Sequence, residues 1–345
     1  MSDTSITKND DEKEITYDTD KINGIISGYI IGDAMGFPYD TPSKVRLANN
    51  KDIIEINKRP YIKPFNSKRQ YMTLGQVSYA TEMSIALQNA LVQEGKWDKN
   101  TVIQSYINWI NTNKYAKYLK NFELFKGIKS IIGYNRNYDR SLSSASDRER
   151  ARSNICLMRM PVLGAYCLKN NVKLSTALEW VEKDVHVTNP NSFCADLCMA
   201  YVNAMYAIYH AEGDNKLLSG LYVLDNIRER VNDNERYLSQ FSFIDIENLD
   251  LNSDKSYIVH PYWCTMEALT MYAKGESIED ILLFIIKRGG EPNVNAAVAG
   301  ALLGMCVGDE VMTLEMKKTY KNIMTADYED SDVDNSEEYN IGHLY

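Results

Sequence analysis

Apolar positions recur every three or four residues through most of the chain, which is the period of an α-helix with one buried face. Alternation of apolar and polar residues, the pattern of a half-buried strand, is short and weak, as in residues 51–57. The sequence therefore predicts an all-α fold of many helices. The predicted helices cover residues 22–36, 81–93, 101–109, 155–168, 174–181, 192–210, 262–273, 278–286 and 293–305.

The first predicted helix carries a glycine at every fourth position, namely Gly24, Gly28, Gly32 and Gly36. Residues four apart lie on the same face of a helix. Each glycine costs about 1 kcal/mol of helix stability relative to alanine. Four glycines in register therefore indicate that another backbone packs closely against this face.

Composition and length favour one large domain. Hydrophobic residues make up 44% of the 345 residues and charged residues 25%, which are values of a globular protein. No change in composition divides the chain. We predict one domain over 21–326 between two acidic tails, 1–20 and 327–345, which are expected to be disordered and dispensable.

Charge, cysteine usage and the lengths of the apolar runs exclude several classes of function. A formal net charge of −9 argues against binding to nucleic acid, which needs clustered Lys and Arg. The apolar runs are too short to cross a bilayer, and the N-terminus has neither the basic start nor the apolar run of a secretory signal. Six cysteines without a CxxC pair are expected to be reduced core thiols. We therefore expect a monomeric, cytoplasmic or nucleocytoplasmic protein that is not secreted.

Residues 24–40, GIISGYIIGDAMGFPYD, resemble the N-terminal signature of the ADP-ribosylglycohydrolases, in which a glycine-striped helix ends in a turn of the form GDAxGxPxE. The resemblance gives Asp33 the buried aspartate position of the family, in the substrate-binding region. It gives Asp40 the position of a carboxylate that acts as general acid or base, with Asp in place of Glu. A turn residue beside Pro42 explains Asp40 equally well.

Two further segments resemble motifs of the same family. SNICLMRMPVLGAY, over 153–166, is similar to S-N-G-x-x-M-R-x-x-P-L, and the match brings Ser153 and Asn154 to ADP-ribose. Helix N-capping by Ser153 is compatible with this role. Residues 185–205 are similar to a T-H-x-x-x-x-A motif that places His186 near the substrate, while a structural histidine before a helix is the alternative.

The fourth block is the longest and most specific. KRGGEPNVNAAVAGALLGM, over 287–305, is similar to the ending GGDTDTNAAIAGALLGA of the family. The four blocks follow one another in family order. The chain is therefore identified as a member of the ADP-ribosylglycohydrolase superfamily. The resemblance implies an all-α, orthogonal multi-helix bundle with a cleft for ADP-ribose or an ADP-ribosylated substrate.

The chain departs from the family at the two motifs that hold magnesium. Active members bind two Mg²⁺ ions through T-D-D-T and D-x-D-T motifs, because hard divalent cations need several oxygen ligands. Here the first motif reads SYAT, so that Ser78 remains but Tyr79 and Ala80 replace two aspartates. The second reads EPNV, which leaves Glu291 and Asn293. We expect Mg²⁺ to bind weakly or not at all at Ser78, Glu291 and Asn293.

Three functions remain open from the sequence. The first is hydrolysis of the N- or O-glycosidic bond between ADP-ribose and an acceptor. The second is a metal-free pseudoenzyme that binds ADP-ribose or a related nucleotide without turnover, and the replaced aspartates favour it. The third is a scaffold whose cleft is closed by the bulky Tyr79.

Overall fold

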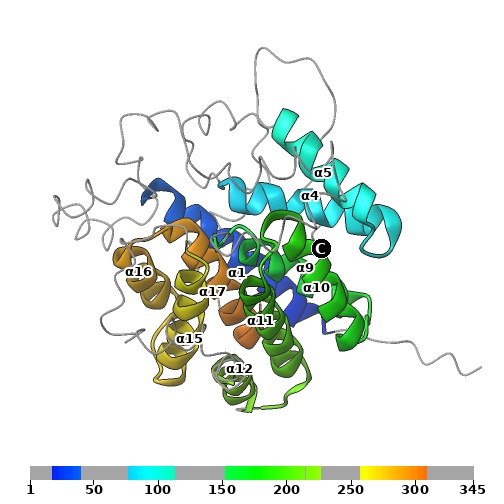
Figure 1. Cartoon of the computed structure of the whole chain (residues 1–345). Helices are drawn as coiled ribbons and strands as arrows, with labels where there is room; N and C mark the ends of the chain where they lie inside the picture. Colours follow the sequence, from blue (N-terminus) through cyan, green and yellow to red (C-terminus); the bar gives the residue numbers. More distant parts are fainter. Residues whose placement is uncertain (1–17, 40–76, 113–151, 214, 227–256, 309–345) are drawn as a thin grey trace, which may run out of the picture.

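The computed structural model describes residues 18–39, 77–112, 152–213, 215–226 and 257–308, and these residues form an all-helical fold (Figure 1). The prediction of an all-α protein is confirmed. Within the described residues the only β-type pairing is an isolated bridge between Ser153 and Tyr257. The α-helices are α1 (Thr19–Gly36), α4 (Tyr79–Glu94), α5 (Lys99–Thr112), α9 (Met160–Lys169), α10 (Leu174–Thr188), α11 (Ser192–His210), α12 (Asn215–Asp225), α15 (Val259–Ala273), α16 (Ile278–Arg288) and α17 (Pro292–Val307), with 3-10 turns at Phe37–Tyr39 and Leu157–Arg159.

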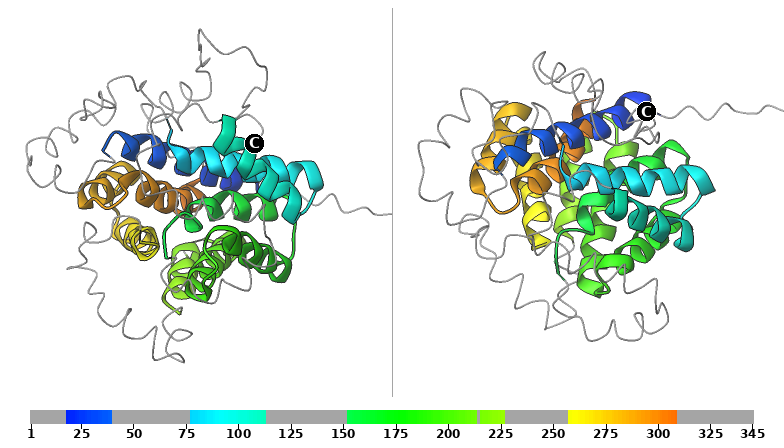
Figure 2. Two further views of the ribbon diagram at one scale, coloured as in Figure 1. Left: turned by 45° about the horizontal axis from the view of Figure 1, so that its top comes forward. Right: turned by 90° about the horizontal axis from the view of Figure 1, so that it is seen from above.

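Helices α1 and α17 lie side by side in the middle of the bundle and run antiparallel (Figures 1 and 2). The glycine stripe of α1 forms the contact. A Cβ atom at Gly28 would overlap the carbonyl of Gly300, and one at Gly24 would overlap the carbonyl of Gly304. Gly36, at the other end of the stripe, faces the backbone of Pro292 at the start of α17. The predicted close packing is therefore confirmed, and it brings the end of α1 to the beginning of α17.

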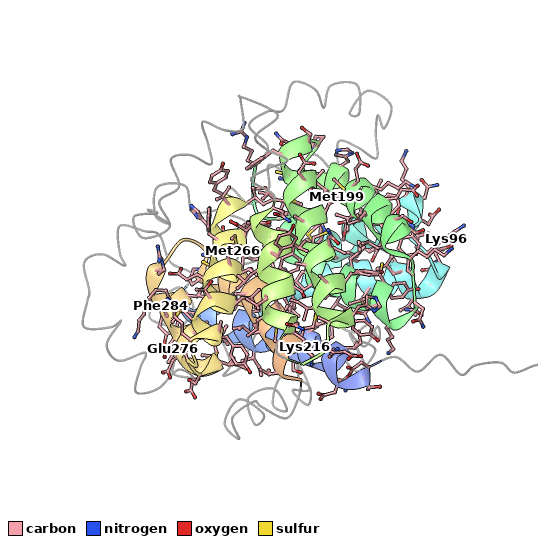
Figure 3. The ribbon with its side chains drawn as sticks, turned by 90° about the horizontal axis from the view of Figure 1, so that it is seen from below. Lys96, Met199, Lys216, Met266, Glu276 and Phe284 are labelled. Carbon is pink, nitrogen blue, oxygen red and sulfur yellow. The ribbon has the colours of Figure 1, made fainter. Side chains whose placement is uncertain are left out.

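The other helices cover this central pair from two sides. Helices α15 and α16 pack on α17, while α9 packs on α1, α4 and α11 (Figure 1). Helix α12 lies between α11 and α15. Seen from below, side chains fill the space between these helices, and the labelled Lys96 and Glu276 lie at opposite outer edges (Figure 3).

Several predicted boundaries differ from the structure. The predicted helix 155–168 is divided, since an α-helix begins only at Met160 and Pro161 lies in its first turn, where a missing amide hydrogen is tolerated. Helix α10 continues seven residues beyond the predicted end at 181. Helix α12 was not predicted at all. Helix α1 begins at Thr19, inside the predicted tail 1–20, because Asp18 caps it.

Some predictions fall outside the described residues. These are the weak strand at 51–57, the acidic tail 327–345 and nearly all of 1–20. The described part of the chain contains no helix that is long and apolar enough to span a membrane. All six cysteines are described, and they are free thiols, as predicted.

Candidate functional site

Asp33, near the end of α1, has its carboxylate at the N-terminus of α4. Oδ2 accepts hydrogen bonds from the Ser78 amide at 3.0 Å, the Thr81 amide at 3.2 Å and the Thr81 hydroxyl at 2.6 Å, and Oδ1 accepts one from Ser78 Oγ at 2.5 Å. Burial raises the pKa of the Asp33 carboxyl above its usual value, while these hydrogen bonds oppose the rise. Asp33 thus satisfies helix-terminal amides of a segment 45 residues away in the sequence.

Asn293, in the first turn of α17, joins the same group. Its Nδ2 donates a hydrogen bond to Ser78 Oγ at 2.9 Å. Asn293 Oδ1 is buried and accepts no hydrogen bond within the described part of the chain. Asp33, Ser78 and Asn293 therefore form one connected chain of side chains, which comes from α1, α4 and α17.

Glu291, two residues before Asn293, is bound by a different predicted residue. The Asn154 Nδ2 donates to Glu291 Oε2 at 2.6 Å, and both side chains are buried. This contact joins the segment before α9 to the segment before α17. Five of the predicted site residues thus lie around the beginning of α17, namely Asp33, Ser78, Asn154, Glu291 and Asn293.

Ser153 is held in place by a residue that the sequence did not indicate. Asn189 Nδ2 donates to both the carbonyl and the hydroxyl oxygen of Ser153, each at 3.1 Å. The backbone of Ser153 is bridged to Tyr257. Ser153 does not cap a helix, since the first turn here is closed by the Met158 amide on the Asn154 carbonyl. The capping interpretation is therefore wrong.

His186 lies in the last turn of α10, and not in a loop before a helix as predicted. Its side chain is half-buried, and no hydrogen bond between described residues connects it to the group around α17. Asp40, the candidate general acid or base, lies outside the described residues.

The positions that differ from the family motifs are buried in the same region. Tyr79 is 2% exposed, and Ala80 and Val294 are fully buried. Glu82, the nearest acidic residue in α4, accepts a hydrogen bond from Trp109 Nε1 of α5 at 3.0 Å. Within the described ranges, no group of three or more His, Cys, Asp or Glu side chains is arranged to hold a metal ion.

A buried ion pair lies next to the segment that carries Ser153 and Asn154. Arg159, directly before α9, contacts Asp184 of α10 through Nε at 2.9 Å and Nη2 at 2.7 Å, and its Nη1 donates to the Ile155 carbonyl at 2.7 Å. Neither charged side chain is exposed to solvent. Asp184 also accepts a hydrogen bond from the Tyr106 hydroxyl at 2.8 Å. This network fixes the segment that carries Ser153 and Asn154 against α10 and α5.

Comparisons with known proteins agree in pointing to one family. The family model described as ADP-ribosylglycohydrolase matches residues 14–333. A protein of Acanthamoeba polyphaga mimivirus, named "Putative ADP-ribosyl glycohydrolase L543", is 22% identical over 303 residues, which cover 81% of this chain and 84% of that protein. The solved structure of an "ADP-ribosylglycohydrolase-related protein complex" has a TM-score of 0.57 at 14% identity and covers 87% of this chain and 92% of its own. At this identity the structural likeness shows the fold alone.

Proposed function

The chain belongs to the ADP-ribosylglycohydrolase family, and on this premise we propose that it binds the ADP-ribosyl group without magnesium and without hydrolysing it. The observation that carries the proposal is the hydrogen-bonded chain of Asp33, Ser78 and Asn293. In the family pattern this region offers clustered carboxylates to two divalent cations. Here the side chains bind one another instead.

The chemistry of the side chains explains why two magnesium ions do not fit. Magnesium needs near-octahedral oxygen coordination with carboxylates that offset its charge. Tyr79, Ala80 and Val294 supply no carboxylate, and both oxygens of Asp33 already accept hydrogen bonds. Asn293 directs a donor, rather than an acceptor, toward Ser78. We derive no catalytic step that passes through a metal ion.

Several polar groups remain for recognition of a ligand. Asn293 Oδ1 is a buried acceptor without a hydrogen bond from the described residues, and such an atom is costly unless a water or ligand donor reaches it. Asn154 and Glu291 form a rigid pair beside it. These groups suit the hydroxyls of a sugar. Ser153, which is held by Asn189, is the neighbour of Asn154 in the sequence and adds a hydroxyl group to these polar groups.

Hydrolysis is the second candidate, and one observation favours it. Glu291 is a carboxylate that is only 3% exposed, at the position where the family has an acidic ligand. With Asp40 as general acid or base, two carboxylates would be available for cleavage of a glycosidic bond. The assignment of Asp40 rests on the resemblance alone.

Titration calorimetry with ADP-ribose distinguishes the two functions. We expect a dissociation constant on the order of 10–100 µM that is the same in EDTA and in magnesium. Asn154→Ala should weaken binding at least about tenfold, because it removes a polar group of the proposed site and its hydrogen bond to the buried Glu291 carboxylate. Asn170→Ala, at an exposed asparagine after α9, is the matched control and should bind as the unmodified chain does.

An assay with an ADP-ribosylated protein substrate decides on turnover. We expect no magnesium-dependent release of ADP-ribose. The triple variant Tyr79→Asp, Ala80→Asp, Asn293→Asp should bind magnesium measurably more tightly, while each single variant should do little, because the ligands act as one cluster. Release of ADP-ribose by the unmodified chain that stops in EDTA would refute the proposal.

A further inference from the structure

Three helices meet at the group formed by Asp33, Ser78 and Asn293, and their connection needs an explanation that does not involve a cation. We infer that the hydrogen-bonded chain from Asn293 through Ser78 to Asp33 takes the place of bound divalent cations as the link between α17, α4 and α1. This inference goes beyond the proposed function, because it concerns how the fold is held together and does not depend on ADP-ribose binding.

The count of protons fixes the direction of every bond in this chain. Ser78 has one hydroxyl hydrogen, and its Oγ lies 2.5 Å from Asp33 Oδ1, which as a carboxylate oxygen only accepts. The hydroxyl hydrogen is therefore donated to Asp33. Ser78 Oγ then acts as acceptor toward the Ala80 amide at 3.1 Å and toward Asn293 Nδ2 at 2.9 Å. Only a donor at position 293 completes the chain.

An aspartate at position 293 would place an acceptor where Ser78 Oγ needs a donor. Its carboxylate would face the lone pairs of Ser78 Oγ with no hydrogen between them, and it would lie in the same buried group as the Asp33 carboxylate. Asp33, Ser78 and Asn293 are each at most 1% exposed, so water would not separate the charges. Such an arrangement requires cations, whereas the asparagine present here requires none.

The packing of α4 shows where the link matters. Helices α1 and α17 are held together by their backbones along the whole glycine stripe. Helix α4 instead packs mainly on α5 and α9, and makes few contacts with α1 and α17. The side chains of Asp33 and Asn293 bond to the N-terminus of α4, and one further hydrogen bond joins Ser84 of α4 to Tyr29 of α1.

Thermal unfolding of the full chain tests the inference in two ways. The first compares the unmodified chain with and without magnesium, and the second compares two single variants with their double variant. The unmodified chain should have the same midpoint, within about 1 °C, in 5 mM EDTA and in 10 mM MgCl2. Ser78→Ala and Asn293→Ala should each lower the midpoint by roughly 5–10 °C. The double variant should lose clearly less than the sum of the two, because the first substitution already breaks the shared bond.

Asn295 provides the matched control for this cycle. It lies in the same buried helix end, but its Nδ2 donates to the Gly289 carbonyl at 3.1 Å and not to Ser78. Ser78→Ala and Asn295→Ala should therefore be additive. Additivity of Ser78→Ala with Asn293→Ala would overturn the inference, and so would a rise of several degrees when magnesium is added to the unmodified chain. Loss of ADP-ribose binding with these results intact would refute only the proposed function.

Discussion

Asp33 makes a contribution to the fold that the sequence did not indicate. The resemblance places it in the substrate-binding region. In the structure its two carboxylate oxygens are occupied by amides and hydroxyls of Ser78 and Thr81. The side chain accepts amide hydrogens at the start of α4 from another helix, in addition to the N-cap Ser78, and this contribution to the fold can be measured.

Replacing Asp33 by alanine should be strongly destabilising. Asp33→Ala removes the acceptor of buried amides at the start of α4, and we expect a loss of about 4 kcal/mol in the free energy of unfolding, measured with urea. Asp18→Ala is the control, because Asp18 caps α1 at an exposed position through the Lys21 amide. It should cost about 1 kcal/mol. A loss below about 2 kcal/mol for Asp33→Ala would show that the cap is replaceable.

Three of the cysteines should be nearly unreactive in the folded chain. Burial raises the pKa of Cys167, Cys264 and Cys306 to about 12. At pH 8 their thiolate fraction is then roughly a thousandfold lower than that of a free cysteine, and alkylation should be correspondingly slow. Labelling followed by mass spectrometry should detect these three cysteines only after unfolding. Rapid labelling of Cys167 at pH 8 would contradict the burial described here.

The same thiols predict how stability changes with alkaline pH. Their pKa in the folded chain, about 12, lies above the ordinary value of 9.0, so the unfolded chain loses its protons first. Stability that is fully present below pH 9 should therefore fall between about pH 9 and pH 12. Urea midpoints measured from pH 7 to pH 10 should decrease only at the alkaline end.

At the scale of elements, the antiparallel pair of α1 and α17 decides where the site lies. Each glycine of α1 faces the backbone of α17, in the order Gly24 to Gly304, Gly28 to Gly300 and Gly32 to Ala296. Because both helices advance by four residues from one contact to the next, the register is fixed along the whole interface. It is this register that brings Asp33 to Asn293.

A methyl group in the middle of this interface should separate the two helices. Gly28→Ala would gain about 1 kcal/mol of helix propensity, yet its Cβ would overlap the Gly300 carbonyl, which cannot move away. We expect a net loss of at least about 3 kcal/mol in urea unfolding. Gly164→Ala is the control, because its Cβ meets only the end of the flexible Met205 side chain. Equal losses in both variants would argue against backbone packing as the cause.

At the scale of the whole molecule, one buried core extends through all the described helices. The family comparison covers residues 14–333, which include the whole predicted domain of 21–326. We propose that the acidic segment 327–345 adds little to stability, since it is rich in Asp and Glu and poor in apolar residues.

Deletion of residues 327–345 tests this proposal. The thermal midpoint of the shortened chain should stay within about 2 °C of the full chain, because too little apolar surface is available to offset ordering of the segment. Differential scanning calorimetry on both proteins provides the comparison. A fall of more than about 5 °C would show that this segment docks on the domain.

The sequence by itself determined the helical class, most helices and the close contact along the glycine stripe. These features follow from local patterns, because helical periodicity and the spacing of glycines involve residues that are close together in the sequence. Helix α12 was missed, and α10 was cut short before His186. The existence of α12 and the end of α10 both depend on packing against helices that are distant in the sequence.

Only the tertiary structure decided what the site residues bind. Asp33 contacts Ser78 and Asn154 contacts Glu291 across separations of 45 and 137 residues, which no local pattern encodes. The roles of Asn189 and of the Arg159–Asp184 pair were likewise hidden in the sequence. A hydrogen bond depends on the position and direction of both partners, and these are set only when distant helices have packed.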